Sequence, residues 1–259
     1  MSDLKITLIQ SDLAWENPKQ NRENFSKKID SINEPADLVI LPEMFTTGFS
    51  MKSKELAETM DGVSVEWMKK KAEERKCVIT GSLIIRENNN FYNRLIWAKH
   101  DGSIEIYDKK HLFRFANEQD YYTPGNKKLM IEIKGWRVSP LICYDLRFPV
   151  WSRNRNDCDL LIYIANWPEV RKDIWRLLLR ARALENQVFV AGVNRVGSDG
   201  NNQPYTGDTA LISPKGIELS NIKPGEEKVE TISISMIELV DFREKYPVWM
   251  DADNFELIQ

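Results

Sequence analysis

Cys143 is the first residue whose type and position suggest chemistry. It follows the apolar run VSPLI and precedes YDLRFP, so we expect it where a buried strand ends and a loop begins. In α/β sheets, active sites are built at that carboxyl end of the strands. A lone Cys in a strand is often only a buried structural thiol, but Asp145 and Arg147 directly after it would be costly to bury without partners. Cys77 and Cys158 lack such neighbours, and we expect both to be structural.

Two other segments carry groups that could assist a thiol. Glu43 follows the apolar run DLVIL and a proline, which delivers a carboxylate at the end of a second buried strand. A helix cap or a pair with an arginine is the alternative role for this residue. Lys109 lies in EIYDKKHLF; if this segment is a strand, Lys109 and Lys110 point to opposite faces, with His111 on the face of Lys109. Spacing alone assigns no role to either segment.

The sequence lacks the motifs of several other mechanisms. It contains no GxGxxG, P-loop, GxSxG or HExxH pattern. Its two histidines, His100 and His111, and its three cysteines without CxxC spacing argue against a zinc site and a disulfide framework. We therefore expect no metal, and chemistry at Cys143 would have to use groups other than a histidine-rich centre.

Composition argues against several classes of partner. A formal net charge of −3 gives no electrostatic reason to expect nucleic acid or an anionic membrane surface. The longest apolar stretch, residues 160–165, is far shorter than the roughly 20 residues that span a bilayer. The N-terminal residues MSDLKITLIQSD do not resemble a signal peptide, so we expect a cytoplasmic protein with reduced thiols.

The elements that must position these groups alternate between short strands and helices. We predict strands at 5–10, 37–41, 77–85, 94–99, 103–107, 129–134, 136–143, 159–165, 188–193, 208–213 and 228–234, and helices at 18–32, 64–76, 170–187 and 236–245. Asn17 is expected to cap the first helix, with Pro18 at its first position, and Ser64 to cap the second. A Gly- and Asn-rich loop occupies 197–207. The length favours one domain over 1–259, ending in an aromatic tail at about 246–259.

The helix predicted at 170–187 is amphipathic. Its apolar face is expected to consist of Ile174, Leu177, Leu178, Ala181 and Leu184. Basic residues also occur along this segment, and we expect them on a solvated surface rather than in a binding patch. They are Arg171, Lys172, Arg176 and Arg180.

Three segments taken together carry a family resemblance. LPEMFTTGF, YDKKHLF and LICYDLRFP, in this order, resemble the signature blocks of the nitrilase, or carbon–nitrogen hydrolase, superfamily. NEQDYYTPGN, ANWP, RARALENQ and NRVGSDGN extend the resemblance over essentially the whole chain, which is most similar to the bacterial omega-amidase-like branch. The resemblance implies a four-layer α-β-β-α sandwich that forms a homodimer or a higher homo-oligomer. The aromatic tail could then pack on a neighbouring copy or cover its own domain.

The resemblance also implies a catalytic triad. Glu43 would be the general base, Lys109 the electrostatic partner and Cys143 the nucleophile, and a second acidic residue of the family's site corresponds to Glu118. A carboxylate can take the thiol proton and an ammonium favours the thiolate, so an amide would be hydrolysed through a thioester without a metal or organic cofactor. For Glu118, the alternative is a salt bridge to Arg114.

The substrate implied by the resemblance is a small dicarboxylate monoamide such as 2-oxoglutaramate. Lys109 and the backbone N–H of Tyr144 would donate hydrogen bonds to the developing oxyanion. Arg147 is our first candidate for the substrate carboxylate, with a structural pair to Asp145 as the alternative. Trp167 could form a wall of the pocket or pack in the core.

Three competing interpretations remain at this point. The same triad could hydrolyse another amide, a nitrile or an N-carbamoyl compound. Cys143 could instead act with His111 in a Cys–His enzyme resembling a protease. In the third interpretation the chain is a non-catalytic α/β binding module in which these residues are only structural.

Overall fold

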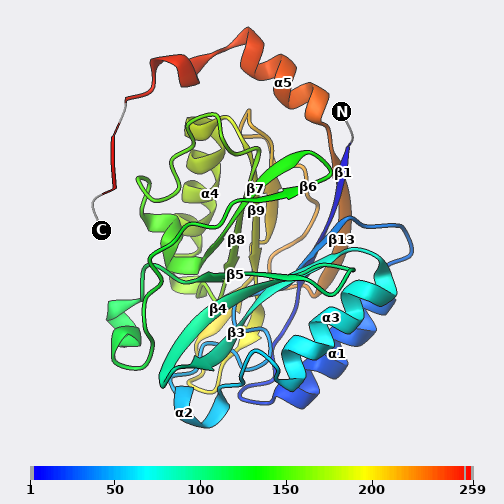
Figure 1. Cartoon of the computed structure of the whole chain (residues 1–259), viewed down its shortest axis with the longest axis vertical. Coiled ribbons are helices and arrows are strands. Elements are labelled where there is room, and N and C mark those ends of the chain that lie inside the picture. Colours follow the sequence, from blue (N-terminus) through cyan, green and yellow to red (C-terminus); the bar gives the residue numbers. More distant parts are fainter. Residues whose placement is uncertain (1–2, 254, 258–259) are drawn as a thin grey trace.

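Two β-sheets lie face to face in the computed structural model, which describes residues 3–253 and 255–257 (Figure 1). The first has the spatial order β13 (Lys228–Ile234), β1 (Leu4–Gln10), β2 (Leu38–Ile40), β3 (Val78–Glu87), β4 (Asn90–Ala98) and β5 (Ile104–Asp108). The second has the order β12 (Ala210–Ile212), β9 (Phe189–Asn194), β8 (Leu160–Ala165), β7 (Trp136–Ile142) and β6 (Ile131–Ile133). All strands predicted from the sequence are present. A further hairpin of β10 (Val196–Ser198) and β11 (Pro204–Thr206) lies in the region predicted as a loop.

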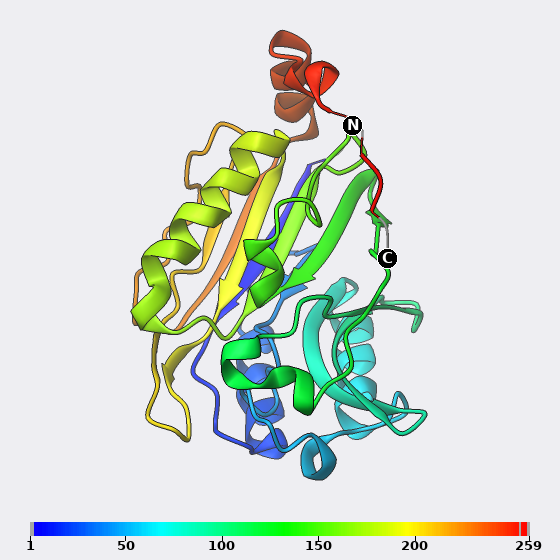
Figure 2. The ribbon, with the colours of Figure 1, turned by 90° about the vertical axis from the view of Figure 1, so that its left-hand side faces the viewer.

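Helices cover the outer face of each sheet. The helices are α1 (Pro18–Asp30), the single turn α2 (Ser53–Leu56), α3 (Val63–Arg75), α4 (Lys172–Asn186) and α5 (Met236–Lys245). α1 and α3 lie on the first sheet, and α4 lies on the second (Figure 2). Buried side chains of these helices belong to the hydrophobic clusters of the sheets that they cover. This order of helix, sheet, sheet and helix confirms the predicted four-layer α-β-β-α sandwich.

The core has one layer between the sheets and a further layer between each sheet and its helices. In β2, Leu38 and Ile40 belong to the layer between the sheets, whereas Val39 packs with Phe25 and Met68 of the helices. A strand with both faces buried requires an unbroken apolar run rather than alternation. The run DLVIL was predicted to be such a strand, and its burial confirms this.

The parallel strands determine where polar side chains can gather. β1, β2 and β3 run parallel to one another, as do β7, β8 and β9. The carboxyl ends of parallel strands meet at one edge of a sheet, which is where α/β proteins place their ligands. Glu43 follows β2 closely, and Cys143 directly follows β7.

The predicted caps of the first two helices have different outcomes. The side chain of Asn17 accepts a hydrogen bond from the backbone N of Gln20, as expected for the cap of α1. The prediction for Ser64 is wrong, because α3 begins at Val63 with Gly62 as its cap. The carboxylate of Glu58 supplies the missing acceptor, at 2.7 Å from the backbone N of Ser64.

The predicted apolar face of α4 is correct only in part, because Ile174 and Leu178 pack against the core whereas Leu177 and Leu184 are exposed. Leu177 and Leu184 are 69% and 50% exposed, and the other three members of that face are only half-buried. The buried face consists instead of Trp175, Leu179, Arg182, Ala183 and Asn186. Polar residues are buried there because they have partners: Arg182 donates to the carbonyl of Leu146 at 2.7 Å, and the Asn186 side chain accepts from the backbone N of Asn154 at 2.8 Å.

The C-terminal elements lie at one end of the molecule (Figure 2). Tyr246 and Trp249 are 51% and 38% exposed, and the guanidinium of Arg155 lies 4.5 Å from the ring centroid of Phe255. Residues 254 and 258–259 of the predicted tail lie outside the described part of the chain. Within the described part, no helix is both long and apolar enough to cross a membrane.

Candidate active site

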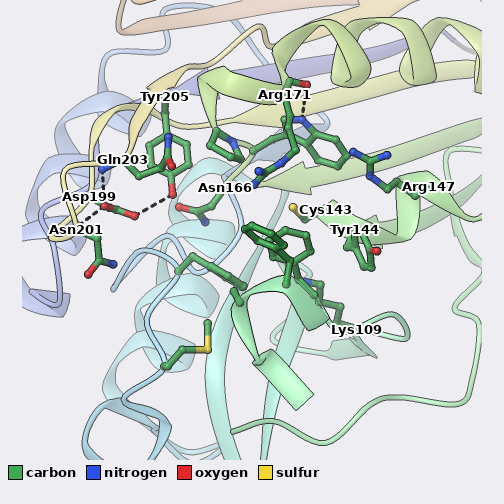
Figure 3. Close-up of a pocket in the computed structure, with 17 residues that line it drawn as sticks. Lys109, Cys143, Tyr144, Arg147, Asn166, Arg171, Asp199, Asn201, Gln203 and Tyr205 are labelled. Carbon is green, nitrogen blue, oxygen red and sulfur yellow. Dashed lines mark hydrogen bonds between the residues drawn. The ribbon is translucent and has the colours of Figure 1, made fainter. Parts of the chain in front are cut away.

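Cys143 occupies a sharp turn at the carboxyl end of β7. Its backbone φ of +45° lies in the left-handed region, which residues other than glycine rarely adopt. A 3₁₀ turn, Cys143–Arg147, follows immediately. Strained backbone of this kind is concentrated at functional sites, and here it accompanies a half-buried thiol that lines a cavity (Figure 3).

Glu43 is fully buried beside this turn and accepts hydrogen bonds from three different segments. Its Oε1 accepts from Nδ2 of Asn93 at 2.7 Å and from Nζ of Lys109 at 2.9 Å. Its Oε2 accepts from the backbone N of Asn166 at 2.8 Å, and the Asn166 side chain donates to the Glu43 carbonyl. Since both oxygens are engaged, the carboxylate has one orientation.

Lys109 is buried directly after β5, and Glu118 is its second carboxylate partner. The Lys109 Nζ lies 3.0 Å from each carboxylate oxygen of Glu118, which also accepts from the backbone N of Phe113 at 2.5 Å. The alternative pair between Glu118 and Arg114 is therefore wrong. β5 ends at Asp108, so the conditional prediction that a continuing strand would align His111 with Lys109 does not apply.

The charges of this cluster determine how each group is protonated. Burial, reinforced by the neighbouring Glu43 and opposed by Lys109, raises the pKa of the Cys143 thiol well above its ordinary value. Although burial favours the neutral amine, Glu118 and Glu43 raise the pKa of Lys109. Burial also raises the pKa of Glu118, against the opposing effect of Lys109. The resting site therefore holds a neutral thiol next to an ammonium and the Glu43 side chain.

A cavity of about 350 Å³ opens beside the thiol (Figure 3). Lys109, Cys143, Tyr144 and Asn166 line it at the catalytic end. Its aromatic and apolar walls include Phe49, Met51, Phe113, Phe115, Trp167 and Pro168. The volume suits a ligand of few heavy atoms, and the small number of polar groups among apolar walls is typical of small-molecule sites.

Two arginines line the same cavity, of which the sequence analysis proposed one. The guanidinium of Arg147 lies 5.3 Å from the ring centroid of Trp167, and that of Arg171 lies 5.2 Å from the ring centroid of Phe113. Arg171 precedes α4 in a 3₁₀ turn, so its placement on a solvated helix surface is wrong. Among the described residues, no carboxylate forms an ion pair with Arg147 or Arg171. The predicted alternative, a pair between Arg147 and Asp145, is therefore wrong.

Trp167 combines the two roles that the sequence left open. It lines the cavity, yet it is only 4% exposed, and its ring centroid lies 5.5 Å from that of Trp175. Asn194 holds its backbone, because its side chain accepts from the Trp167 N at 2.8 Å and donates to the Trp167 carbonyl at 2.9 Å. The indole is thus a rigid wall.

His111 belongs to a different cluster. Its Nδ1 lies 2.7 Å from Oδ1 of Asp145, and its ring stacks on Phe148 with 3.7 Å between centroids. It is not among the residues that line the cavity with Cys143. The proposed Cys–His pair therefore has no support in the geometry.

The other two cysteines lie away from the cavity and are 2% exposed. Burial raises the pKa of Cys77 to about 11 and that of Cys158 to about 12. Both properties agree with the structural role expected for these thiols. In the described residues no group of three or more His, Cys, Asp or Glu side chains is arranged to hold a metal ion.

The sequence analysis missed Asn93, Asn166 and Arg171, and also the side of the cavity formed by the β10–β11 hairpin. Asn166 and Arg171 follow β8 at its carboxyl end, a position that could have identified them as site residues. Asn93 is an interior residue of β4, and its contact with Glu43 has no signal in the sequence. The hairpin contributes Asp199, Asn201, Gln203 and Tyr205.

Comparisons with known proteins agree with this geometry. A family model described as "Carbon-nitrogen hydrolase" matches residues 5–244. The chain is 44% identical to a protein named omega-amidase YafV from Escherichia coli (strain K12), over 99% of this chain and 100% of that one. It is 35% identical to a 2-oxoglutaramate amidase from Bacillus subtilis (strain 168), over 95% and 96% of the two chains.

A solved structure is similar over the same extent. It is that of XC1258 from Xanthomonas campestris, described as a CN-hydrolase superfamily protein with an arsenic adduct in the active site. The TM-score is 0.97 at 45% sequence identity, and the match covers 99% of this chain and 100% of that one. Nit3 from Saccharomyces cerevisiae, at 24% identity and a TM-score of 0.84, shares the fold.

Proposed function

The chain belongs to the carbon–nitrogen hydrolase family, in the omega-amidase-like branch of the nitrilase superfamily, and from that premise we propose how it acts. It is a hydrolase of carbon–nitrogen bonds other than peptide bonds. Its reaction is that of an omega-amidase, which converts the terminal amide of a small dicarboxylate monoamide such as 2-oxoglutaramate into the acid and ammonia. One observation carries this proposal: Cys143 and Lys109, whose Nζ lies 2.9 Å from Oε1 of Glu43, line the same small cavity.

The first half of the reaction forms a thioester. Glu43 accepts the proton of the Cys143 thiol as the sulfur attacks the amide carbon. The oxyanion accepts hydrogen bonds from the ammonium of Lys109 and the backbone N–H of Tyr144. Glu43 then returns the proton to the leaving nitrogen, and ammonia departs as the carbon–nitrogen bond breaks.

The second half hydrolyses the thioester. Glu43 takes a proton from water, and the resulting hydroxide attacks the acyl carbon. The carbon–sulfur bond breaks, the proton returns to the sulfur, and the acid product leaves. The raised pKa of the Cys143 thiol suits this cycle, because the proton stays on sulfur until substrate is present. Glu118 holds Lys109 in place throughout, and no step requires a metal or organic cofactor.

Arg147 and Arg171 are the proposed partners of the substrate carboxylate. A guanidinium binds a carboxylate bidentately, and neither side chain forms an ion pair with a carboxylate of the described chain. Stacking against aromatic rings keeps each guanidinium oriented. Trp167 lines the cavity together with Arg147, whose guanidinium lies over its ring. The ligand is thus a small molecule with an amide at one end and a carboxylate at the other.

A substrate panel tests this function. Purified enzyme is assayed for ammonia with 2-oxoglutaramate, 2-oxosuccinamate, succinamate, a matched nitrile, an N-carbamoyl acid and an amide without a carboxylate. We expect the carboxylate-bearing amides to be the best substrates and Cys143→Ala to be inactive. Cys77→Ala, which removes a buried thiol outside the cavity, is the matched control and keeps its activity. Turnover by Cys143→Ala would contradict the mechanism, and preference for the nitrile or carbamoyl compound would contradict the substrate class.

We also propose that two copies of the chain, each a single domain over 1–259, form a homodimer in the cytoplasm. The support is α4, which presents Leu177 and Leu184 to solvent at 69% and 50% exposure. Single exposed apolar residues are common on proteins. Leu177 and Leu184, however, lie on the same side of α4, and other apolar residues of this helix are only half-buried. A reducing compartment keeps a thiol nucleophile in its active form.

A further inference from the structure

Asp145 is a buried carboxylate outside the proposed triad. It is 0% exposed, and it lies two residues after Cys143. Its Oδ2 accepts from the Tyr107 hydroxyl at 2.7 Å and from the backbone N of Ile142 at 3.0 Å. Its Oδ1 accepts from the backbone N of His111 at 3.0 Å and contacts Nδ1 of the same residue at 2.7 Å. Four polar groups therefore meet one carboxylate.

These four groups come from the two segments that carry the triad's cation and its nucleophile. Tyr107 and His111 each lie two residues from Lys109, on either side of it. Ile142 directly precedes Cys143, and Asp145 itself belongs to the turn that the nucleophile begins. The carboxylate therefore joins two segments that are separated by about 30 positions in the sequence.

Further contacts make this cluster rigid. The Tyr107 hydroxyl also accepts from Nε1 of Trp151 at 3.0 Å and from the backbone N of Lys110 at 3.3 Å. Burial and the neighbouring Asp145 raise the pKa of Tyr107, so its hydroxyl keeps its proton and donates it to the carboxylate. The His111 ring stacks on Phe148 at an interplanar angle of 8°.

We propose that Asp145 is a positioning residue that sets the distance and orientation of the Lys109 ammonium relative to the Cys143 sulfur. It touches neither the substrate nor the reacting atoms, and it acts by tying the Lys109 segment to the nucleophile turn. This inference rests on the proposed function for its kinetic consequence only, since the geometry of the thiol can be probed without substrate.

Asparagine cannot replace this carboxylate, although the two side chains have nearly the same shape. Asparagine has one oxygen and one NH₂ group, so its NH₂ group must face either the N–H of Ile142 or the N–H of His111. In both orientations two donors oppose each other and a buried group is left unsatisfied. The nucleophile turn and the Lys109 segment would then separate locally.

The test compares Asp145→Asn with two other variants. Tyr107→Phe removes one of the four polar groups and keeps the ring. Asp159→Asn is the matched control, because Asp159 is also a buried carboxylate, held by Arg137 and Arg243 rather than by segments of the site. For each variant we would measure the melting temperature, kcat and KM with the best amide, and the rate of Cys143 alkylation by iodoacetamide without substrate.

For a positioning role, we expect Asp145→Asn to lower kcat about 100-fold, the cost of roughly 1 Å of misplacement. KM should change less than kcat, because Arg171, one of the two proposed partners of the substrate carboxylate, lies outside the nucleophile turn. Tyr107→Phe has a smaller effect of the same kind, and the alkylation rate of Cys143 changes in parallel. Asp159→Asn keeps the wild-type kcat per folded molecule even where it loses more stability.

Two results would overturn the proposal. The first is a kcat of wild-type size in folded Asp145→Asn, which would make the residue merely structural. The second is an equal fall in kcat for Asp145→Asn and Asp159→Asn, which would attribute the loss to general destabilisation. A wild-type enzyme without amidase activity would contradict the proposed function alone, because the alkylation rates would still report whether Asp145 positions the thiol.

Discussion

The Glu43 carboxylate illustrates the chemistry of this site at the scale of single residues. It accepts hydrogen bonds from Lys109, Asn93 and Asn166, each in a different segment of the chain. These donors orient the carboxylate while the pKa of the neighbouring thiol is raised. The proposed mechanism therefore uses proton transfer from the thiol to Glu43 during attack rather than a preformed thiolate.

Selective labelling of cysteine tests the state of this thiol. At neutral pH we expect iodoacetamide to modify Cys143 first, because it lines a cavity beside a carboxylate that can take its proton. Cys77 and Cys158 are protected by burial away from the cavity. Peptide mass mapping after brief labelling measures the three sites separately. Earlier labelling of Cys77 or Cys158 in folded protein would contradict this description.

Replacement of Arg171 tests how the substrate carboxylate is bound. We expect Arg171→Met to raise KM for a carboxylate-bearing amide by roughly 10- to 100-fold, corresponding to about 1.5–3 kcal/mol for a hydrogen bond to a charged group. The KM of an amide without a carboxylate should change little. Arg180→Met, which removes an exposed basic residue of α4 outside the cavity, is the control. Equal effects on both substrates would show that Arg171 does not bind the carboxylate.

At the scale of elements, Asp159 joins three parts of the fold at the end opposite the nucleophile turn. It precedes β8, and its oxygens accept hydrogen bonds from Arg137 at the start of β7 and from Arg243 of α5. The Asp159 carboxylate is nearly inaccessible. A buried ion pair contributes little to stability when compared with an apolar replacement of both partners. Loss of one partner, however, leaves the other charge uncompensated and destabilises the fold.

We therefore expect Asp159→Asn to lower the free energy of unfolding by about 3 kcal/mol, because the buried guanidinium of Arg243 and the partly exposed guanidinium of Arg137 lose their counter-charge. Urea denaturation at neutral pH measures this change. Glu66→Gln, which breaks an exposed pair on α3, should change the stability by less than about 1 kcal/mol. An equally small effect for Asp159→Asn would mean that the contacts of Asp159 with Arg137 and Arg243 are not important for stability.

The ionisation of Asp159 should make the stability of the fold depend on pH. Although burial favours protonation, hydrogen bonds from Arg137 and Arg243 hold the pKa of Asp159 below its ordinary value of 3.8. A carboxyl with a lowered pKa stabilises the folded state above its unfolded pKa, and this contribution is lost as the pH falls through the folded pKa. The stability difference between wild type and Asp159→Asn should thus be full at neutral pH and shrink below about pH 4. A constant difference from pH 7 to pH 3 would contradict this.

At the scale of the whole molecule, α4 has an apolar surface that the layers of a single chain do not cover. α4 buries one face on the second sheet and exposes Leu177 and Leu184 on another. The helix has apolar residues on more of its circumference than one sheet can cover. A second copy of the chain would cover the rest in the proposed homodimer.

Charge on this surface should therefore separate the dimer. We expect wild type to have twice the mass of one chain by size-exclusion chromatography with light scattering, and the double variant Leu177→Lys, Leu184→Lys to have the mass of one chain. The reason is that two lysines would be desolvated at the contact. Val63→Lys, at an exposed apolar residue of α3 on the opposite layer, is the control. A double variant that remains dimeric would place the contact elsewhere.

The sequence by itself determined the strands and two candidate residues of the site, and the family resemblance supplied the layer order. Apolar runs such as DLVIL predict buried strands, because a strand with both faces buried needs consecutive apolar residues. Glu43 and Cys143 directly or closely follow such runs, so chain order alone brings them to the carboxyl ends of parallel strands. The family resemblance identified Lys109 and Glu118 as their partners, and in the structure Lys109 contacts both Glu43 and Glu118.

Tertiary structure alone decided which polar residues are buried and with what. Arg182 and Asn186, rather than Leu177 and Leu184, lie on the buried face of α4. They can be buried because each forms a hydrogen bond there, Arg182 to a backbone carbonyl and Asn186 to a backbone N–H. Arg171 enters the cavity because Phe113 and Phe115, about 55 positions earlier, stack against it. Asp145 faces Tyr107 and His111 rather than Arg147. Burial of apolar surface produces a periodic pattern of apolar residues in the sequence. Hydrogen bonds and stacking between distant segments produce no such pattern.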